Sequence, residues 1–160
     1  MIEPNPEAVA TLKANIWLNN LNGVCDTGHL GIGLGAETAE GYGISFRRPK
    51  WTEKNLGGAT LAAGDGDIAI STGDNVLGGS RADFIKIDVE GMEMLVLAGL
   101  RQTIRDFAPT LFVEVDNQNA DEMLEWQKAN NYYVAEEFSR YPTNTNLLLK
   151  PKPQQPASPA

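Results

Sequence analysis

Hydrophobic residues recur with a helical period near the start of the chain, in PEAVATLKANIWLNN (residues 6–20). The apolar positions on one face of this expected helix are Val9, Leu12 and Ile16. Asn5 is the predicted N-cap, because its side-chain oxygen can accept a backbone N–H of the first turn, and Pro6 suits the first helical position. Residues 2–3 read as the end of a buried strand that leads into the helix.

The middle of the chain, residues 28–79, is rich in glycine and its pattern is weaker. Alternating segments around YGISF and DIAIST predict hairpin-like strands. The sequence GDGD at 64–67 predicts the turn of a tight hairpin, since glycine supplies the positive-φ positions that such turns use. The segment NGVCD (22–26) is predicted as a further short strand.

The second half alternates between strand and helix patterns. Strands are predicted at 82–91, 110–115, 132–138 and 146–150, and helices at 91–107 and 120–130. Pro109 marks the end of the first helix, and Asn119 is the predicted cap of the second. This order predicts an α/β fold with a Rossmann-like, mostly parallel sheet and a closing antiparallel strand. We expect one domain over residues 1–150 and a disordered, proline-rich tail at 151–160.

Composition narrows the function classes. The formal charge of −8 argues against a nucleic-acid binder, because the chain has no basic field to attract phosphate. A single cysteine, Cys25, and a single histidine, His29, exclude a disulfide framework and disfavour a zinc site, so no metal is expected. No apolar run reaches the roughly 18 residues that a membrane span needs. A cytoplasmic location is therefore expected.

The segment IKIDVEG places charge where a central parallel strand should be apolar. Strand alternation puts Lys86, Asp88 and Glu90 on one face. Asp88 and Glu90 lie at the carboxyl end, where open α/β sheets bind their ligands. The sequence predicts a ligand-facing carboxylate pair. The structural alternative is that Lys86 pairs with a carboxylate while Glu90 faces water, and a weaker functional alternative is an acid/base pair that processes glycans.

Two further acids end strand-like segments. Glu114 closes TLFVEV and is a candidate for substrate contact, with a structural salt bridge or a helix-cap contact as the alternative. Glu3 ends the strand-like residues 2–3, and an acid at the end of the second strand of a Rossmann-like sheet hydrogen-bonds the ribose of a nucleotide cofactor. Beside Asp88, Glu3 is therefore a candidate for binding a nucleotide cofactor.

Three other motifs carry less weight. GHLGIGLGA (28–36) has neither the preceding strand nor the following helix that a phosphate loop needs. The acids Asp65, Asp67 and Asp74 lack the glycine and closing glutamate of a calcium loop. A Ser/His/Asp triad would have to use His29, and no nucleophile elbow accompanies it.

The segment DFIKIDVEGME (83–93) resembles the FkbM-type family of S-adenosylmethionine-dependent methyltransferases. The sequence shares with that family EPNP at residues 3–6, a P-x-L-x-x-E strand at 109–114 and a late N-x-L strand at 146–148. Asn55-Leu56-Gly57-Gly58 resembles a stretch of the family's variable region. The likeness extends over most of residues 2–149.

The resemblance implies a class I methyltransferase fold and methyl transfer to a hydroxyl of a small molecule or sugar. It implies cofactor contacts from Glu3, Asn5 and Asp88, and substrate contacts from Asn55, Gly57 and Glu114. Asp88 or Glu90 would serve as the catalytic base, with Lys86 keeping them ionised by proximity.

The family's first strand and its glycine-rich turn should precede EPNP, and they are absent from the sequence. The sequence thus predicts a partial methyltransferase domain with an exposed sheet edge, which favours a homo-oligomer or a complementing chain. The alternative is a non-catalytic binding module that has lost its cofactor site.

Overall fold

The computed structural model describes residues 1–46, 59–64 and 66–153. The chain divides into two compact units, which we describe separately. Unit 1 comprises Met1–Gly79 and Leu95–Arg101, and unit 2 comprises Ser80–Met94 and Gln102–Ala160. Within the described ranges, no helix combines the length and the apolar character needed to cross a bilayer.

Unit 1 begins with a two-residue strand and a capped helix. Strand β1 (Ile2–Glu3) pairs in parallel with β2 (His29–Leu30), and helix α1 spans Pro6–Leu18. The Asn5 side chain accepts the Glu7 N–H at 3.0 Å, which confirms the predicted N-cap. The strand predicted at 22–26 is wrong, because the N–H groups of residues 24 and 25 turn back to the Leu21 carbonyl.

The larger sheet of unit 1 has the strand order β3-β6-β4-β5. Its strands are β3 (Gly33–Leu34), β4 (Ala39–Phe46), β5 (Ala59–Ala63) and β6 (Ile68–Ser71). Both β5 and β6 pair with β4, so the predicted GDGD hairpin between them is wrong. The connection instead passes close to β4, where a Cβ on Gly66 would lie 2.0 Å from the Tyr42 carbonyl oxygen. Helix α2 (Gly73–Leu77) follows, capped by Thr72.

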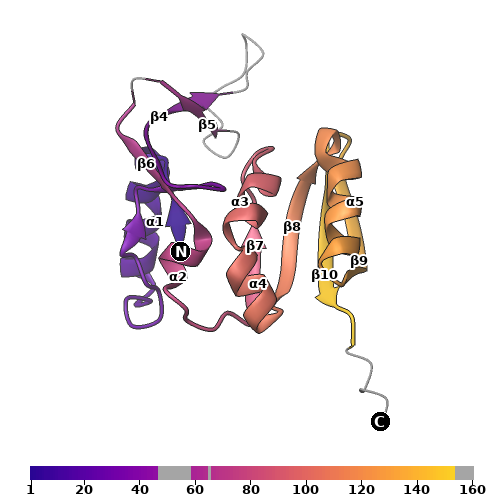
Figure 1. Cartoon of the computed structure of the whole chain (residues 1–160). Helices are drawn as coiled ribbons and strands as arrows, with labels where there is room; N and C mark the ends of the chain where they lie inside the picture. The colour runs from indigo at the N-terminus through magenta and orange to yellow at the C-terminus, as the bar shows by residue number, and fades with distance from the viewer. Residues whose placement is uncertain (47–58, 65, 154–160) are drawn as a thin grey trace. The chain divides into compact units, whose positions relative to one another are not determined.

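Unit 2 is built on a four-stranded sheet with the order β7-β8-β10-β9 (Figure 1). Its strands are β7 (Phe84–Ile87), β8 (Thr110–Asp116), β9 (Tyr132–Tyr141) and β10 (Asn144–Pro151). Strands β7 and β8 are parallel, whereas β10 runs antiparallel to both of its neighbours. The α/β class is confirmed, but the sheets are mixed rather than mostly parallel. The two-residue turn from β9 to β10 makes this pair antiparallel, since so short a connection cannot join parallel strands.

The helix predicted at 91–107 is divided into α3 (Glu93–Gly99) and α4 (Arg101–Phe107). The break falls after Gly99, a residue with low helix propensity, and the Leu100 N–H bonds to Leu97 instead of continuing the helical pattern. The expected apolar face is buried at Leu97, Leu100 and Ile104, and Phe107 is half-buried.

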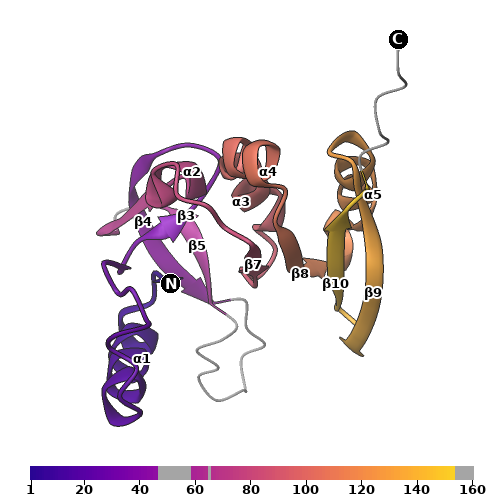
Figure 2. The ribbon, with the colours of Figure 1, turned by 90° about the horizontal axis from the view of Figure 1, so that it is seen from below.

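Helix α5 (Ala120–Ala129) packs on the sheet of unit 2 and lies alongside β9 (Figure 2). The core between them contains Leu111, Val113, Val115, Met123 and Leu149, each at most 3% exposed. Strand β8 alternates strictly between buried and half-buried residues, so its second face carries Phe112 and Glu114. Because Leu111, Val113 and Val115 must face the core, strand alternation places Phe112 and Glu114 on the opposite face of the sheet.

Hydrogen bonds from Tyr132 and Lys152 hold the end of the sheet where β9 begins and β10 ends. The Tyr132 ring lies 5.5 Å from that of Trp126, and its hydroxyl donates to the Pro109 carbonyl at 2.7 Å. Strand β10 runs to Pro151, and the Lys152 N–H donates to the Asn131 carbonyl at 2.7 Å. The predicted tail thus begins with paired residues, and its remainder, 154–160, lies outside the described residues.

Replacing Tyr132 by Phe should lower the free energy of unfolding by about 1–2 kcal/mol, because the Pro109 carbonyl loses its buried donor. Burial raises the pKa of Tyr132 to about 12. Since this pKa lies above the ordinary phenol value, the phenol stabilises the folded state at lower pH and loses that contribution as pH rises toward 12. Denaturant unfolding and ultraviolet titration test both points. A late-titrating phenol that persists in Tyr132→Phe contradicts the assignment.

Candidate functional site

The first polar site, in unit 1, is formed by Glu3 and Asn5. Strand β1 is held by the Gly31 N–H, which donates to the Glu3 carbonyl at 2.8 Å. The Glu3 side chain then turns back, and its Oε1 accepts the Asn5 N–H at 2.8 Å. Asn5 itself is only 4% exposed. The two predicted residues therefore lie in direct contact at the start of α1.

The Asn5 amide is only half satisfied. Its Oδ1 caps α1, but its buried Nδ2 has no hydrogen-bond partner within the described part of the chain. A buried, unpaired amide N–H costs free energy comparable to a lost hydrogen bond. This orphan donor belongs to a residue whose backbone N–H is bonded to the Glu3 carboxylate. A donor and a carboxylate acceptor are the two groups that bind a hydroxyl.

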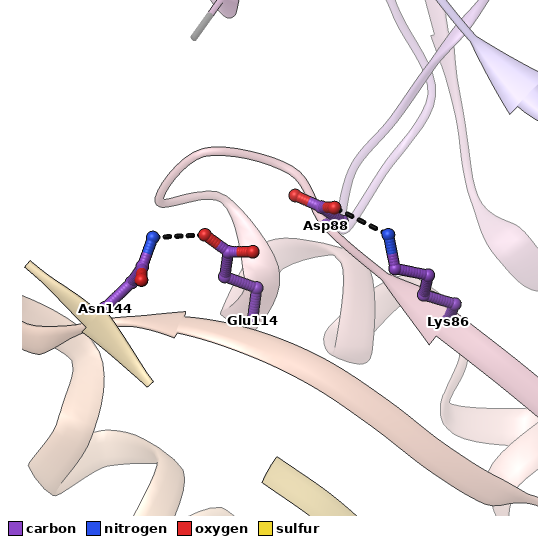
Figure 3. Close-up of polar contacts among 4 residues, drawn as sticks. All are labelled: Lys86, Asp88, Glu114 and Asn144. Atoms are coloured by element: carbon purple, nitrogen blue, oxygen red, sulfur yellow. Dashed lines mark hydrogen bonds and ion pairs between the residues drawn. The ribbon is translucent and has the colours of Figure 1, made fainter. Parts of the chain in front are cut away.

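The second polar site, in unit 2, lies where β7 and β8 end. The register pairs Ile87 with Val113, so the next residues along, Asp88 and Glu114, come side by side on the same face. Figure 3 shows four side chains in a row: Asn144, Glu114, Asp88 and Lys86. Asn144 comes from β10, which is antiparallel to β8. Three strands therefore supply one polar edge.

Two hydrogen bonds join these four side chains into two pairs. Lys86 Nζ donates to Asp88 Oδ2 at 2.6 Å, and both side chains are substantially exposed (Figure 3). Asn144 Nδ2 donates to Glu114 Oε1. The pairing of Lys86 with a carboxylate is the structural alternative considered from the sequence. An exposed ion pair of this kind adds at most about 1 kcal/mol to stability.

The Glu114 carboxyl has a raised pKa. Burial raises the pKa of its carboxyl above the ordinary value, and the nearby Asp88 carboxylate raises it further. The hydrogen bond from Asn144 and the charge of Lys86 lower this pKa, and Glu93 adds a small rise. The net effect is a carboxyl that holds a proton more readily than an exposed glutamate does.

Glu90 does not continue the strand. Its φ of 49° and the φ of 88° at Gly91 place two successive residues in the left-handed region, which glycine tolerates and glutamate rarely adopts. The alternation that would place Glu90 on the face of Lys86 and Asp88 therefore ends before it. Asn55 and Gly57, the other substrate candidates, lie outside the described residues.

Glu93 and Asn119, neither of which was a site candidate from the sequence, hold this loop in place. Glu93 is 0% exposed, and its Oε1 accepts the Asp116 N–H at 2.7 Å and the Asn119 Nδ2–H at 2.9 Å. Asn119 also donates to the Gly91 carbonyl at 3.1 Å. Asn119 is thus a bridge between two loops and not the predicted side-chain cap of α5. The only signal in the sequence was a charged residue inside an otherwise apolar helix start.

A short 3₁₀ turn, η2 (Asn117–Asn119), joins β8 to α5, and the Asp116 side chain caps it by accepting the Gln118 N–H. Asn117 makes two hydrogen bonds to the turn between β9 and β10. Its Nδ2 donates to the Pro142 carbonyl at 2.8 Å, and its backbone N–H donates to the Thr143 carbonyl at 3.1 Å. These bonds fix the turn that leads into Asn144. No group of three His, Cys, Asp or Glu side chains suited to a metal ion occurs in the described ranges.

Comparison with known proteins identifies the family. A family model for the methyltransferase FkbM domain matches residues 1–134. The chain belongs to the FkbM methyltransferase domain family. No curated relative matches the sequence. The fold resembles the crystal structure of methyltransferase FkbM from Methylobacillus flagellatus KT, with a TM-score of 0.60 and 20% identity.

That structural match covers 93% of this chain but 35% of the Methylobacillus flagellatus chain. At this identity the likeness establishes the fold alone. The FkbM assignment made from the motifs at residues 3–6 and 83–93 is confirmed, and so is the α/β fold. The roles of individual residues remain predictions.

The buried Glu93 bridge can be tested by two substitutions. Glu93→Ala leaves the Asp116 N–H and the Asn119 amide without their acceptor, and should lower the free energy of unfolding by about 2–4 kcal/mol. Glu93→Gln keeps an acceptor oxygen and removes a buried charge, so it should stay within about 1 kcal/mol of the wild type. Urea unfolding measures both. Equal losses in the two variants would contradict the bridge.

The Glu114 carboxyl should leave a pH signature in stability. Its raised folded-state pKa favours the folded state at low pH, and this contribution disappears as pH rises through that pKa. Relative to the wild type, Glu114→Gln should therefore become more stable with rising pH. Urea unfolding at a series of pH values measures the difference, with the exposed Glu122→Gln on α5 as control. A pH-independent difference for Glu114→Gln contradicts this expectation.

Proposed function

We propose that this FkbM-family chain takes part in methyl transfer from S-adenosylmethionine to a hydroxyl of a small molecule or sugar. The observation that carries the proposal is the hydrogen bond from the Asn5 backbone N–H to Glu3, on a residue whose buried side-chain Nδ2 has no partner within the described part of the chain. The chain belongs to a methyltransferase family. Because the chain corresponds to about a third of the Methylobacillus flagellatus protein's length, the activity of a whole protein is part of the proposal.

The residues at β1 fit the ribose of such a cofactor. A ribose offers two neighbouring hydroxyls, each able to donate and accept a hydrogen bond. Glu3 supplies carboxylate oxygens, of which Oε1 already accepts the Asn5 N–H, and Asn5 supplies the unpaired Nδ2 donor. Binding a hydroxyl at Nδ2 would satisfy the one polar atom that the fold leaves buried and unpaired there.

The polar edge of unit 2 would serve the acceptor. When bound, the cofactor supplies an electrophilic methyl group on a sulfonium. The chain must orient an acceptor oxygen and accept its proton, and positioning accounts for much of the rate gain in such a transfer. Asp88 and Glu90 are the proton acceptors predicted from the sequence, and Lys86 lies against Asp88.

Calorimetric titration with S-adenosylmethionine tests the cofactor site. Glu3→Gln removes the ribose-binding charge and should weaken binding at least roughly tenfold, the effect of losing one charge-assisted hydrogen bond. Asn5→Asp removes the Nδ2 donor but keeps the oxygen that caps α1, so it should weaken binding with little loss of helix stability.

Asn5→Ala provides the matched control, since it removes the cap as well and should cost about 1 kcal/mol of stability. If the wild-type chain gives no heat at high micromolar S-adenosylmethionine, the proposed cofactor site is wrong for this chain. The alternative of a non-catalytic binding module would then be favoured.

A further inference from the structure

The row of side chains at the ends of β7, β8 and β10 contains two carboxylates with different partners. Lys86 occupies Oδ2 of Asp88, and its charge compensates the Asp88 carboxylate. Within the described residues, the Glu114 carboxylate forms no ion pair, and the only hydrogen bond to its side chain comes from the neutral Asn144 amide. The carboxylate without a cation is the one better suited to accept a proton.

The Asn144 amide can form a hydrogen bond with Glu114 in both of its protonation states. Its Nδ2 donates to the carboxylate, while its buried Oδ1 has no partner within the described part of the chain. If Glu114 gained a proton, rotation of the amide would let Oδ1 accept the new O–H. A side chain with one donor and one acceptor can therefore hold the carboxyl before and after proton transfer.

From this arrangement we infer that Glu114, held by Asn144, is the group that takes the proton of the acceptor hydroxyl. The inference rests on the proposed methyl transfer. In the step, the acceptor oxygen forms a bond to the methyl carbon, and the carbon–sulfur bond breaks with its electron pair remaining on sulfur. The hydroxyl proton passes to the Glu114 carboxylate, which becomes a neutral carboxylic acid and later releases the proton to solvent.

The surrounding charges suit this role. Asp88 on β7 and Glu93 at the start of α3 raise the pKa of Glu114 together with burial, whereas Lys86 on β7 and Asn144 on β10 lower it. A base works best when its pKa approaches the working pH, because it is then ionised and still binds a proton well. Sequence reasoning favoured Asp88 or Glu90, since it could not show which carboxylate Lys86 would pair with.

Carbon-detected NMR of the glutamate carboxyl groups tests the inference on the intact chain without cofactor. The Glu114 resonance is assigned by its loss in Glu114→Gln. Its titration should lie above those of exposed glutamates. Asp88→Asn should shift it to lower pH by removing a like charge, while Lys86→Met and Asn144→Ala should shift it to higher pH.

The second measurement is transfer of labelled methyl from S-adenosylmethionine to a panel of methyl glycosides of hexoses and deoxyhexoses. Glu114→Gln should reduce the rate roughly 100-fold or more, the usual effect of losing a general base, with little change in cofactor binding. Glu122→Gln on α5 is the matched control. Asn144→Ala should move the acid limb of the rate profile to higher pH, which a merely structural role would not do.

The outcomes distinguish failure of the Glu114 inference from failure of the proposed methyl transfer. An ordinary Glu114 titration that the three variants leave unmoved overturns the inference, whatever the transfer assay gives. Transfer retained in Glu114→Gln but lost in Glu90→Gly also overturns it, because the glycine keeps the left-handed turn and removes only the carboxylate. Absence of transfer to every glycoside of the panel, despite a raised and movable Glu114 titration, overturns the proposed methylation of a sugar hydroxyl and the catalytic role with it.

Discussion

The insertion of β10 between β8 and β9 is the constraint on which the polar edge of unit 2 depends. Because β10 runs antiparallel to β8, its first residues meet the last residues of β8. Asn144 therefore meets Glu114 at the same end of the sheet where β7 delivers Asp88. A parallel strand in that place would bring its carboxyl end to this edge, and the residues near Asn144 would lie at the other end of the sheet.

The buried Glu93 carboxylate performs a different task in the same unit. It joins the start of α3 to the end of β8 through the Asp116 N–H, and Asn119 extends the connection to Gly91. The loop between β7 and α3 contains two left-handed residues and could adopt other conformations on its own. Burying a carboxylate is costly, and two donors to Oε1 offset part of this cost and hold one loop geometry, while Oε2 has no hydrogen-bond partner within the described residues.

The sequence indicated the segments with strong periodicity and clear capping chemistry. Helix α1 and its Asn5 cap, strand β8 and helix α5 follow from apolar spacing and from local hydrogen bonding, which neighbouring residues decide. The strand order β3-β6-β4-β5 could not be read this way, because β5 and β6 pair with β4 across the chain and not with each other. Likewise, strand alternation grouped Glu90 with Asp88, but backbone torsions at Glu90 and Gly91 end that alternation.

The long strand β9 forms one edge of its sheet, since among the described strands it pairs with β10 alone. An edge strand of ten residues offers a row of backbone groups with which another extended chain can pair. Glu136 and Glu137 are adjacent, exposed and on opposite faces of this strand. A second copy pairing along β9 would bring like charges together on whichever face it approached. Charge repulsion thus disfavours pairing of β9 with β9 of a second copy, whereas a basic extended segment would meet no such repulsion.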